Sequence, residues 1–105
     1  MSSWRGGYVP GVPAPDDPLA DVLDVLARRG ALAVFRALVQ GSLGERALET
    51  RLKAYAPSVV AQRVADLRRA GAVEVVPENG DLRLSPRGRR LQGLLDQLSR
   101  WAEDS

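Results

Sequence analysis

Residues 57–71 have the sequence of a helix with two different sides, which limits what the rest of the chain can be. Val60, Val64 and Leu67 recur at the spacing that places apolar side chains along one side of a helix. The segment opens with a proline and closes with a glycine, which suit the first helical position and the residue just past the last turn. One side is therefore expected in a core, and the other faces solvent or a ligand.

The outer side of this helix is expected to carry Ser58, Val59, Gln62, Arg63 and Asp66. In a DNA major groove, glutamine pairs bidentately with adenine and arginine with guanine, so Gln62 and Arg63 are candidates for reading bases. Arg63 could equally clamp a phosphate. Ser58 could donate to a phosphate at the helix N-terminus, and Val59 could touch a thymine methyl. On the same side, the Asp66 carboxylate would repel a phosphate.

The composition excludes several classes of protein. A chain of 105 residues has room for one domain with a modest core. Without cysteine or histidine there is no disulfide, no thiol or imidazole sensor and no common metal site. The sequence has neither paired carboxylates in an apolar setting nor a glycine-rich phosphate loop, which are patterns that would suggest an enzyme. No enzymatic activity, cofactor or metal is therefore expected. No apolar run is long enough for a membrane span, and the N-terminus does not have the pattern of a signal peptide. A cytoplasmic location is therefore expected.

Positive charge is concentrated in the middle of the chain. The net charge is only +2, but residues 44–90 hold ten Lys/Arg and six Asp/Glu, whereas the remainder is slightly acidic. A local basic surface is what phosphate contacts require, although a scattered solvated surface would give the same count.

Residues 1–17 form a glycine- and proline-rich arm, and residues 18–105 are expected to form the folded domain. The arm could dock on its own core, cross to a partner subunit, or stay flexible with a DNA contact through Arg5. A first helix should start at Pro18, capped by Asp17, and stop at Gly30. Its apolar stripe is Leu19, Val22, Leu23 and Leu26.

A second helix is expected from about Ala31 to Gly41, and a third after a capping box formed by Ser42 and Glu45. The inward residues would be Leu32, Phe35, Leu38 and Val39 in the second helix, and Leu48 and Leu52 in the third. A short link then leads into residues 57–71, which is the arrangement of a helix-turn-helix.

Beyond residue 71 the apolar period changes to that of strands. Residues 72–76 and 82–84 are expected to pair across a turn at Asn79 and Gly80. Ser85 and Pro86 start a last helix that runs to about Glu103. Its apolar stripe is long for so small a core, so part of it is expected to form a dimer interface; alternatively it folds back on the first helix. The interface residues would be Leu91, Leu94, Leu95, Leu98 and Trp101.

The chain resembles the HxlR-type transcriptional regulators, within the wider MarR-like superfamily, over roughly residues 23–102. The residues that carry the resemblance are Leu38 with Gly41, Leu48 with Leu52, the run 62–67 with Gly71, and the run 84–88. It implies a mainly α fold with a small β-hairpin, a winged helix-turn-helix whose N- and C-terminal helices form a dimer interface. It also implies a homodimer that binds double-stranded operator DNA.

Within this resemblance, arginines and one lysine outside the recognition helix are candidate phosphate contacts. They are Arg46, Arg51 and Lys53 on one side, and Arg83 and Arg87 of the wing on the other. The small net charge and the wing acids Glu78 and Asp81 leave a second hypothesis open, a winged-helix module that binds protein instead of DNA. A small apolar effector between subunits is compatible with the sequence, but its identity is unknown.

Overall fold

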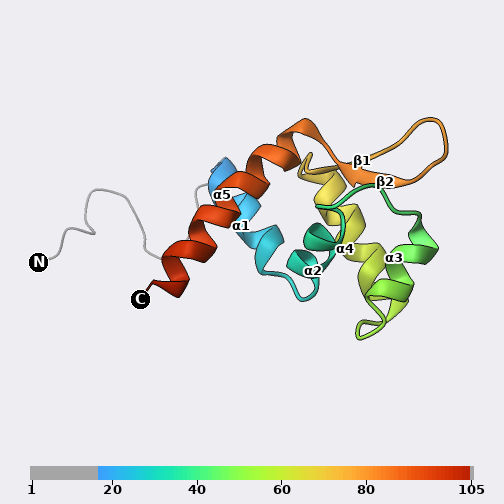
Figure 1. Cartoon of the computed structure of the whole chain (residues 1–105), viewed down its shortest axis with the longest axis horizontal. Coiled ribbons are helices and arrows are strands. Elements are labelled where there is room, and N and C mark those ends of the chain that lie inside the picture. The colour runs from blue at the N-terminus through green and yellow to red at the C-terminus, as the bar shows by residue number, and fades with distance from the viewer. Residues whose placement is uncertain (1–16, 105) are drawn as a thin grey trace, which may run out of the picture.

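The protein is seen in a computed structural model that describes residues 17–104 (Figure 1). The elements in chain order are α1 Pro18–Ala27, α2 Ala31–Ala37, α3 Glu45–Arg51, α4 Pro57–Arg69, β1 Val73–Val75, β2 Leu82–Leu84 and α5 Pro86–Glu103. This is the expected winged helix-turn-helix, mainly α with one hairpin. The expectations for the N-terminal arm concern residues 1–16, which lie outside the described residues.

The core lies between α2, α3, α4 and the hairpin. Phe35, Leu48, Val60, Leu67 and Leu84 are almost completely buried there and belong to one cluster. The apolar side predicted for residues 57–71 is therefore confirmed as the inner side of α4.

The prediction that Leu32 faces inward is wrong, because this side chain is exposed. The buried residues of α2 and its C-cap are Ala31, Val34, Phe35 and Leu38, which follow helical spacing one position away from Leu32. Phe35 and Leu38 are buried as predicted and Val39 is half-buried against the core, so only Leu32 is misplaced.

Two of the three predicted helix caps are present. The Asp17 carboxylate accepts from the backbone amides of Leu19 and Ala20 at the start of α1. The Ser85 hydroxyl accepts from the Gly88 amide at the start of α5, at 2.9 Å. The capping box of Ser42 and Glu45 does not form, since α3 begins after Gly44 without a side-chain cap.

The missing cap is explained by Leu43, the residue that follows Ser42. Leu43 makes an isolated antiparallel bridge to Leu82, with two backbone hydrogen bonds of 2.9 and 2.8 Å. The chain is therefore held beside the hairpin at Leu43, and Ser42 lies before this bridge instead of at the helix start. The wing itself pairs Val73 with Leu84 and Val75 with Leu82.

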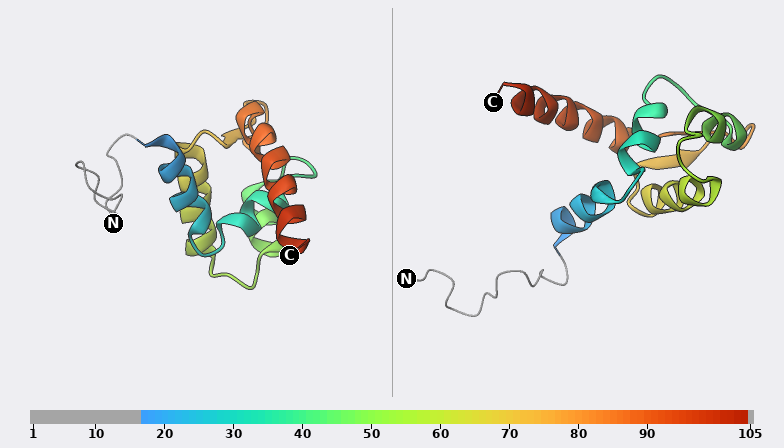
Figure 2. Two further views of the ribbon diagram at one scale, coloured as in Figure 1. Left: turned by 90° about the vertical axis from the view of Figure 1, so that its left-hand side faces the viewer. Right: turned by 90° about the horizontal axis from the view of Figure 1, so that it is seen from below.

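Helices α1 and α5 extend from the same side of the winged-helix body and diverge from each other (Figure 2). The outer part of α5 carries exposed Leu94, Leu98 and Trp101, the last with 69% of its surface accessible. On α1, Leu19 and Leu23 are exposed as well. The alternative that α5 folds back on α1 and covers its own stripe is therefore wrong for this outer part. Within residues 17–104, no helix combines the length and apolarity needed to cross a membrane.

The close approach of α5 to the chain just after α4 gives a first prediction. A Cβ at Gly88 would run into the backbone carbonyl of Ala72, whereas a Cβ at Gly93, further along the same helix, would meet open space. Gly88→Ala should lower the free energy of unfolding by about 1–3 kcal/mol. Gly93→Ala, the matched control, should raise it by about 0.4–1 kcal/mol. Urea unfolding of both variants checks this; equal effects would contradict the packing.

Candidate nucleic-acid interface

The outer side of α4 is open to solvent along the whole helix. After Pro57, the exposed residues of α4 are Ser58, Ala61, Gln62, Ala65, Arg68 and Arg69. Two of the predicted DNA contacts, Ser58 and Gln62, lie on this side. The N-cap residue Ala56 offers no side-chain bond, so the first amides of α4 have no side-chain acceptor from the cap.

Val59 and Arg63 lie at the edge of this surface and are half-buried, in contrast to their predicted exposure. The Arg63 side chain is only 19% exposed, and its Nε lies 3.3 Å from the Asp66 carboxylate. Its aliphatic part lies beside Gly30, in the turn between α1 and α2, together with Tyr55. The buried side of α4 is therefore wider than the stripe of three residues, because this turn packs against it.

Arg68 and Arg69 are exposed cations of α4 that the sequence alone does not assign to the interface. At the C-terminal end of a helix, such charges are already explained by the favourable helix dipole. The signal that could have identified Arg69 is its position on the helix, away from Val60, Val64 and Leu67, whereas Arg68 lies one turn after Val64 and its exposure is known only from the structure. Ala61 and Ala65 lie between them and Ser58, so the side chains in the middle of the open side are small.

Asp66 is buried, with 2% of its surface exposed, and the prediction that it faces outward is wrong. Its Oδ1 accepts hydrogen bonds from Arg69 Nη2 at 2.8 Å and from Gln62 Nε2 at 3.2 Å. Arg28, from the C-terminal end of α1, places Nη1 3.1 Å from the same oxygen. These donors supply partners to Oδ1, as a buried charge requires, while Oδ2 has only the ion pair with Arg63 Nε and no hydrogen bond. No local pattern around residue 66 predicts this, because Arg28 is distant in the chain.

The surroundings of Asp66 have opposing effects on its pKa. Burial alone would raise the pKa of the carboxyl, but hydrogen bonds from Arg28, Gln62 and Arg69 outweigh it, and the pKa is lowered. Asp66 is therefore ionised at neutral pH. The open side of α4 presents only neutral and cationic groups, because the single carboxylate of this helix is turned inward and paired.

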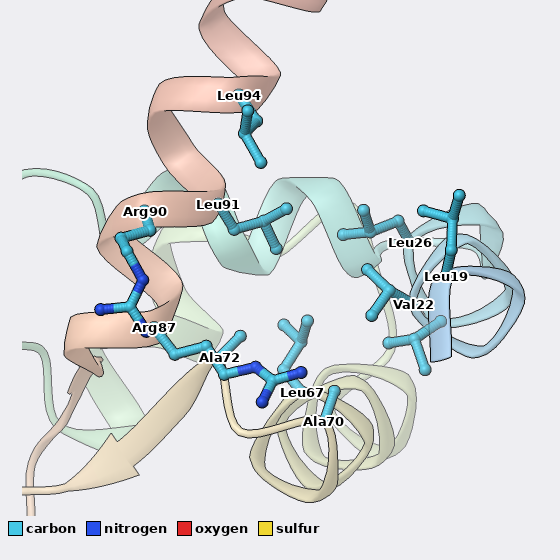
Figure 3. Close-up of a pocket in the computed structure, with 11 residues that line it drawn as sticks. Leu19, Val22, Leu26, Leu67, Ala70, Ala72, Arg87, Arg90, Leu91 and Leu94 are labelled. Atoms are coloured by element: carbon cyan, nitrogen blue, oxygen red, sulfur yellow. The ribbon is translucent and has the colours of Figure 1, made fainter. Parts of the chain in front are cut away.

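The candidate phosphate contacts divide into free and engaged groups. Arg46 and Arg51 of α3 and Lys53, just after it, are exposed next to the link into α4. On the wing, Arg83 Nε donates to the Glu74 carboxylate at 2.7 Å, across the hairpin. Arg87 is exposed, but it reaches toward Ala70 at the end of α4 rather than toward the hairpin (Figure 3). The α3 side is therefore better provided with free cations than the wing.

A largely apolar cleft opens between α1, the end of α4 and α5 (Figure 3). Its volume is about 380 Å³, and Leu19, Leu26, Leu91 and Leu94 line it, with Arg87 and Arg90 on the α5 side. Of the predicted interface residues, Leu91 and Leu95 are half-buried against the core, while Leu94, Leu98 and Trp101 are exposed.

No protein-family model matches the chain by sequence, and no curated protein is detectably similar. The fold does match solved structures. The reduced form of the transcriptional regulator YodB from B. subtilis has a TM-score of 0.73 at 20% identity, covering 88% of this chain and 93% of that one. A transcriptional regulator of the MarR family from Enterococcus faecalis V583 has a TM-score of 0.67 at 22% identity, covering 88% and 91%. HlyU from Vibrio cholerae N16961 has a TM-score of 0.62 at 26% identity, covering 77% and 90%. These similarities establish the winged-helix fold.

The lowered pKa of Asp66 gives the second prediction. Its contribution to stability should be complete above the carboxyl pKa of the unfolded chain, about 3.9, and lost as the pH falls through the lower folded value. At pH 7, Asp66→Asn should reduce the free energy of unfolding by about 1–3 kcal/mol. The difference between wild type and variant should shrink below about pH 4. Urea unfolding from pH 7 to 3 measures it, and a difference independent of pH would contradict the role of the charge.

Proposed function

We propose that the chain is a DNA-binding transcriptional regulator that acts as a homodimer, with α4 in the major groove and the wing against the backbone. The observation that carries this proposal is the open side of α4, which offers hydrogen-bonding and cationic groups while its carboxylate is buried. Such a surface suits a groove lined by phosphates. The solved structures of similar fold described as transcriptional regulators support the same function. A closer relation to the HxlR type stays part of the proposal.

Each candidate residue has a proposed role. Gln62 reads a base, Ser58 donates to a phosphate, and Arg68, exposed on the same side, contacts a base or a phosphate. Val59 and Arg63, at the edge of the open side, contact the groove wall. The remaining phosphate contacts are Arg46, Arg51, Lys53, Arg83 and Arg87, of which Arg83 has to share its guanidinium with Glu74.

The homodimer is proposed from the diverging helices α1 and α5. Exposed Leu19 and Leu94 line the apolar cleft, and Leu98 and Trp101 continue the exposed stripe further along α5. A second copy inserting its own α5 there would remove this surface from water. A two-fold axis makes the contact self-complementary, because both copies supply the same residues. It would also place the two α4 helices about 34 Å apart, so that each meets one of two successive major grooves.

The alternative function is a winged-helix module that binds protein without specific DNA contact. The wing favours it, because Arg83 is paired with Glu74 and Glu78 is exposed near the tip. A salt titration separates the two hypotheses. Affinity for an arbitrary duplex should fall steeply and linearly on a log–log plot if phosphates are contacted. No binding at low salt would favour the alternative.

The third prediction concerns Arg68. Arg68→Ala should weaken binding to duplex DNA and reduce the salt slope by about one if the residue contacts a phosphate. If it reads a base, the loss should be about 1–3 kcal/mol and confined to the preferred sequence. Arg100→Ala, which removes the same charge from the far part of α5, is the matched control. Equal effects of both variants would remove Arg68 from the interface.

The fourth prediction concerns self-association. Trp101→Ala should weaken the dimer by about 2 kcal/mol or more, which is roughly a thirty-fold rise in its dissociation constant. Sedimentation equilibrium measures the effect, and Leu32→Ala, which removes an exposed apolar side chain from α2, serves as control. A wild-type chain that is monomeric at micromolar concentration would overturn the proposed dimer.

A further inference from the structure

Gln62 and Asp66 are one helical turn apart on α4, and their side chains are joined by a hydrogen bond. Gln62 Nε2 donates to Asp66 Oδ1 at 3.2 Å. We infer that Asp66 is a positioning residue for base recognition, which fixes how Gln62 presents its amide and makes this position favour adenine over guanine. The inference rests on the proposed function, because it specifies what one residue of the DNA-binding surface would select.

The orientation of the Gln62 amide follows from the chemistry of its partner. An ionised carboxylate only accepts hydrogen bonds, so the amide nitrogen must face Asp66 and the amide oxygen must point elsewhere. The anchor is itself held in place. The Asp66 side chain is 1% exposed, and Arg69 Nη2 and Arg28 Nη1 contact the same oxygen at 2.8 and 3.1 Å. Gln62, by contrast, is exposed, so its oxygen and second N–H are available at the surface.

The hydrogen bond to Asp66 decides with which base the Gln62 amide can form two hydrogen bonds at once. A free glutamine amide has two N–H groups and one acceptor oxygen. Guanine shows two acceptors in the major groove, N7 and O6, and pairing with both requires both N–H groups. Adenine shows one acceptor, N7, and one donor, N6, and it requires only one N–H group and the oxygen. With one N–H committed to Asp66, the adenine pattern is the one that Gln62 can still satisfy.

Replacing Asp66 by alanine removes this commitment and frees both N–H groups. Adenine and guanine should then be accepted similarly at the position that Gln62 contacts. Asp66→Asn is the matched control, because it changes the net charge by the same amount as alanine but keeps an oxygen. That oxygen should occupy the Oδ1 position, where the donors of Gln62, Arg28 and Arg69 converge.

The experiment begins with selection of bound sequences from a randomised duplex library by the full chain. The base position whose preference disappears in Gln62→Ala is the position assigned to Gln62. Affinities are then measured by fluorescence anisotropy for a pair of duplexes that carry adenine or guanine there. The wild type should prefer adenine by about 5- to 150-fold, the discrimination expected of one bidentate pair. Asp66→Asn should keep most of this ratio, and Asp66→Ala should bring it close to one.

An Arg69→Ala background separates the hydrogen bond to Gln62 from the contact that Asp66 makes with exposed Arg69. Arg69 loses a partner in Asp66→Ala and could itself bind guanine, so the same loss of preference is expected in an Arg69→Ala background. Circular dichroism melting shows whether each variant folds. If Asp66→Ala does not fold, Asp66→Ser replaces it, because serine leaves a polar group in the buried site but is too short to place an oxygen where Oδ1 holds Gln62.

Three results would overturn the inference: an adenine preference unchanged in Asp66→Ala, a guanine preference in the wild type, or no position that depends on Gln62. In each case, salt-dependent binding of the wild type to arbitrary duplex would leave the proposed DNA binding intact. Failure to bind any duplex at low salt would overturn the proposed function as well.

Discussion

The buried carboxylate of Asp66 connects the helix that would meet DNA with the helix that would meet a second copy. Arg28 extends from the end of α1, and Gln62, Arg63 and Arg69 extend from α4 itself. A buried carboxylate without these partners would be costly, so the ion pairs constrain where α1 can lie against α4. The same contact removes negative charge from the open side of α4 and restrains side chains at its edge.

The elements of this fold could be predicted from the sequence where local chemistry decides them. Asp17 and Ser85 cap helices because a short polar side chain precedes a proline in each case, and both caps are present. The buried side of α4 followed from the spacing of Val60, Val64 and Leu67. The outer part of the α5 stripe is exposed, and the dimer interface predicted for it stays a prediction.

Sequence-based prediction fails where residues distant in the chain decide the outcome. Ser42 is not a cap because Leu43 pairs with Leu82, which no local pattern around residue 42 reveals. Aspartate is ordinarily exposed, but Arg28 provides a partner that makes the burial of Asp66 possible. For the candidate site, the positions of Ser58 and Gln62 on the open side are predicted correctly. That of Arg63 is not, because its exposure depends on the packing of the α1–α2 turn.

A second junction joins α5 to the end of α4. The Ser85 hydroxyl donates to the Gly71 carbonyl, the Ser85 amide donates to the Ala72 carbonyl, and Gly88 packs directly on Ala72. The base of α5 is thus held at the C-terminal end of α4, just as α1 is held through Arg28 and Asp66. In a dimer built on α1 and α5, the angle between these two helices would therefore set the position of both α4 helices. As long as both junctions hold, a change in that angle would also change the spacing of the two DNA-binding surfaces.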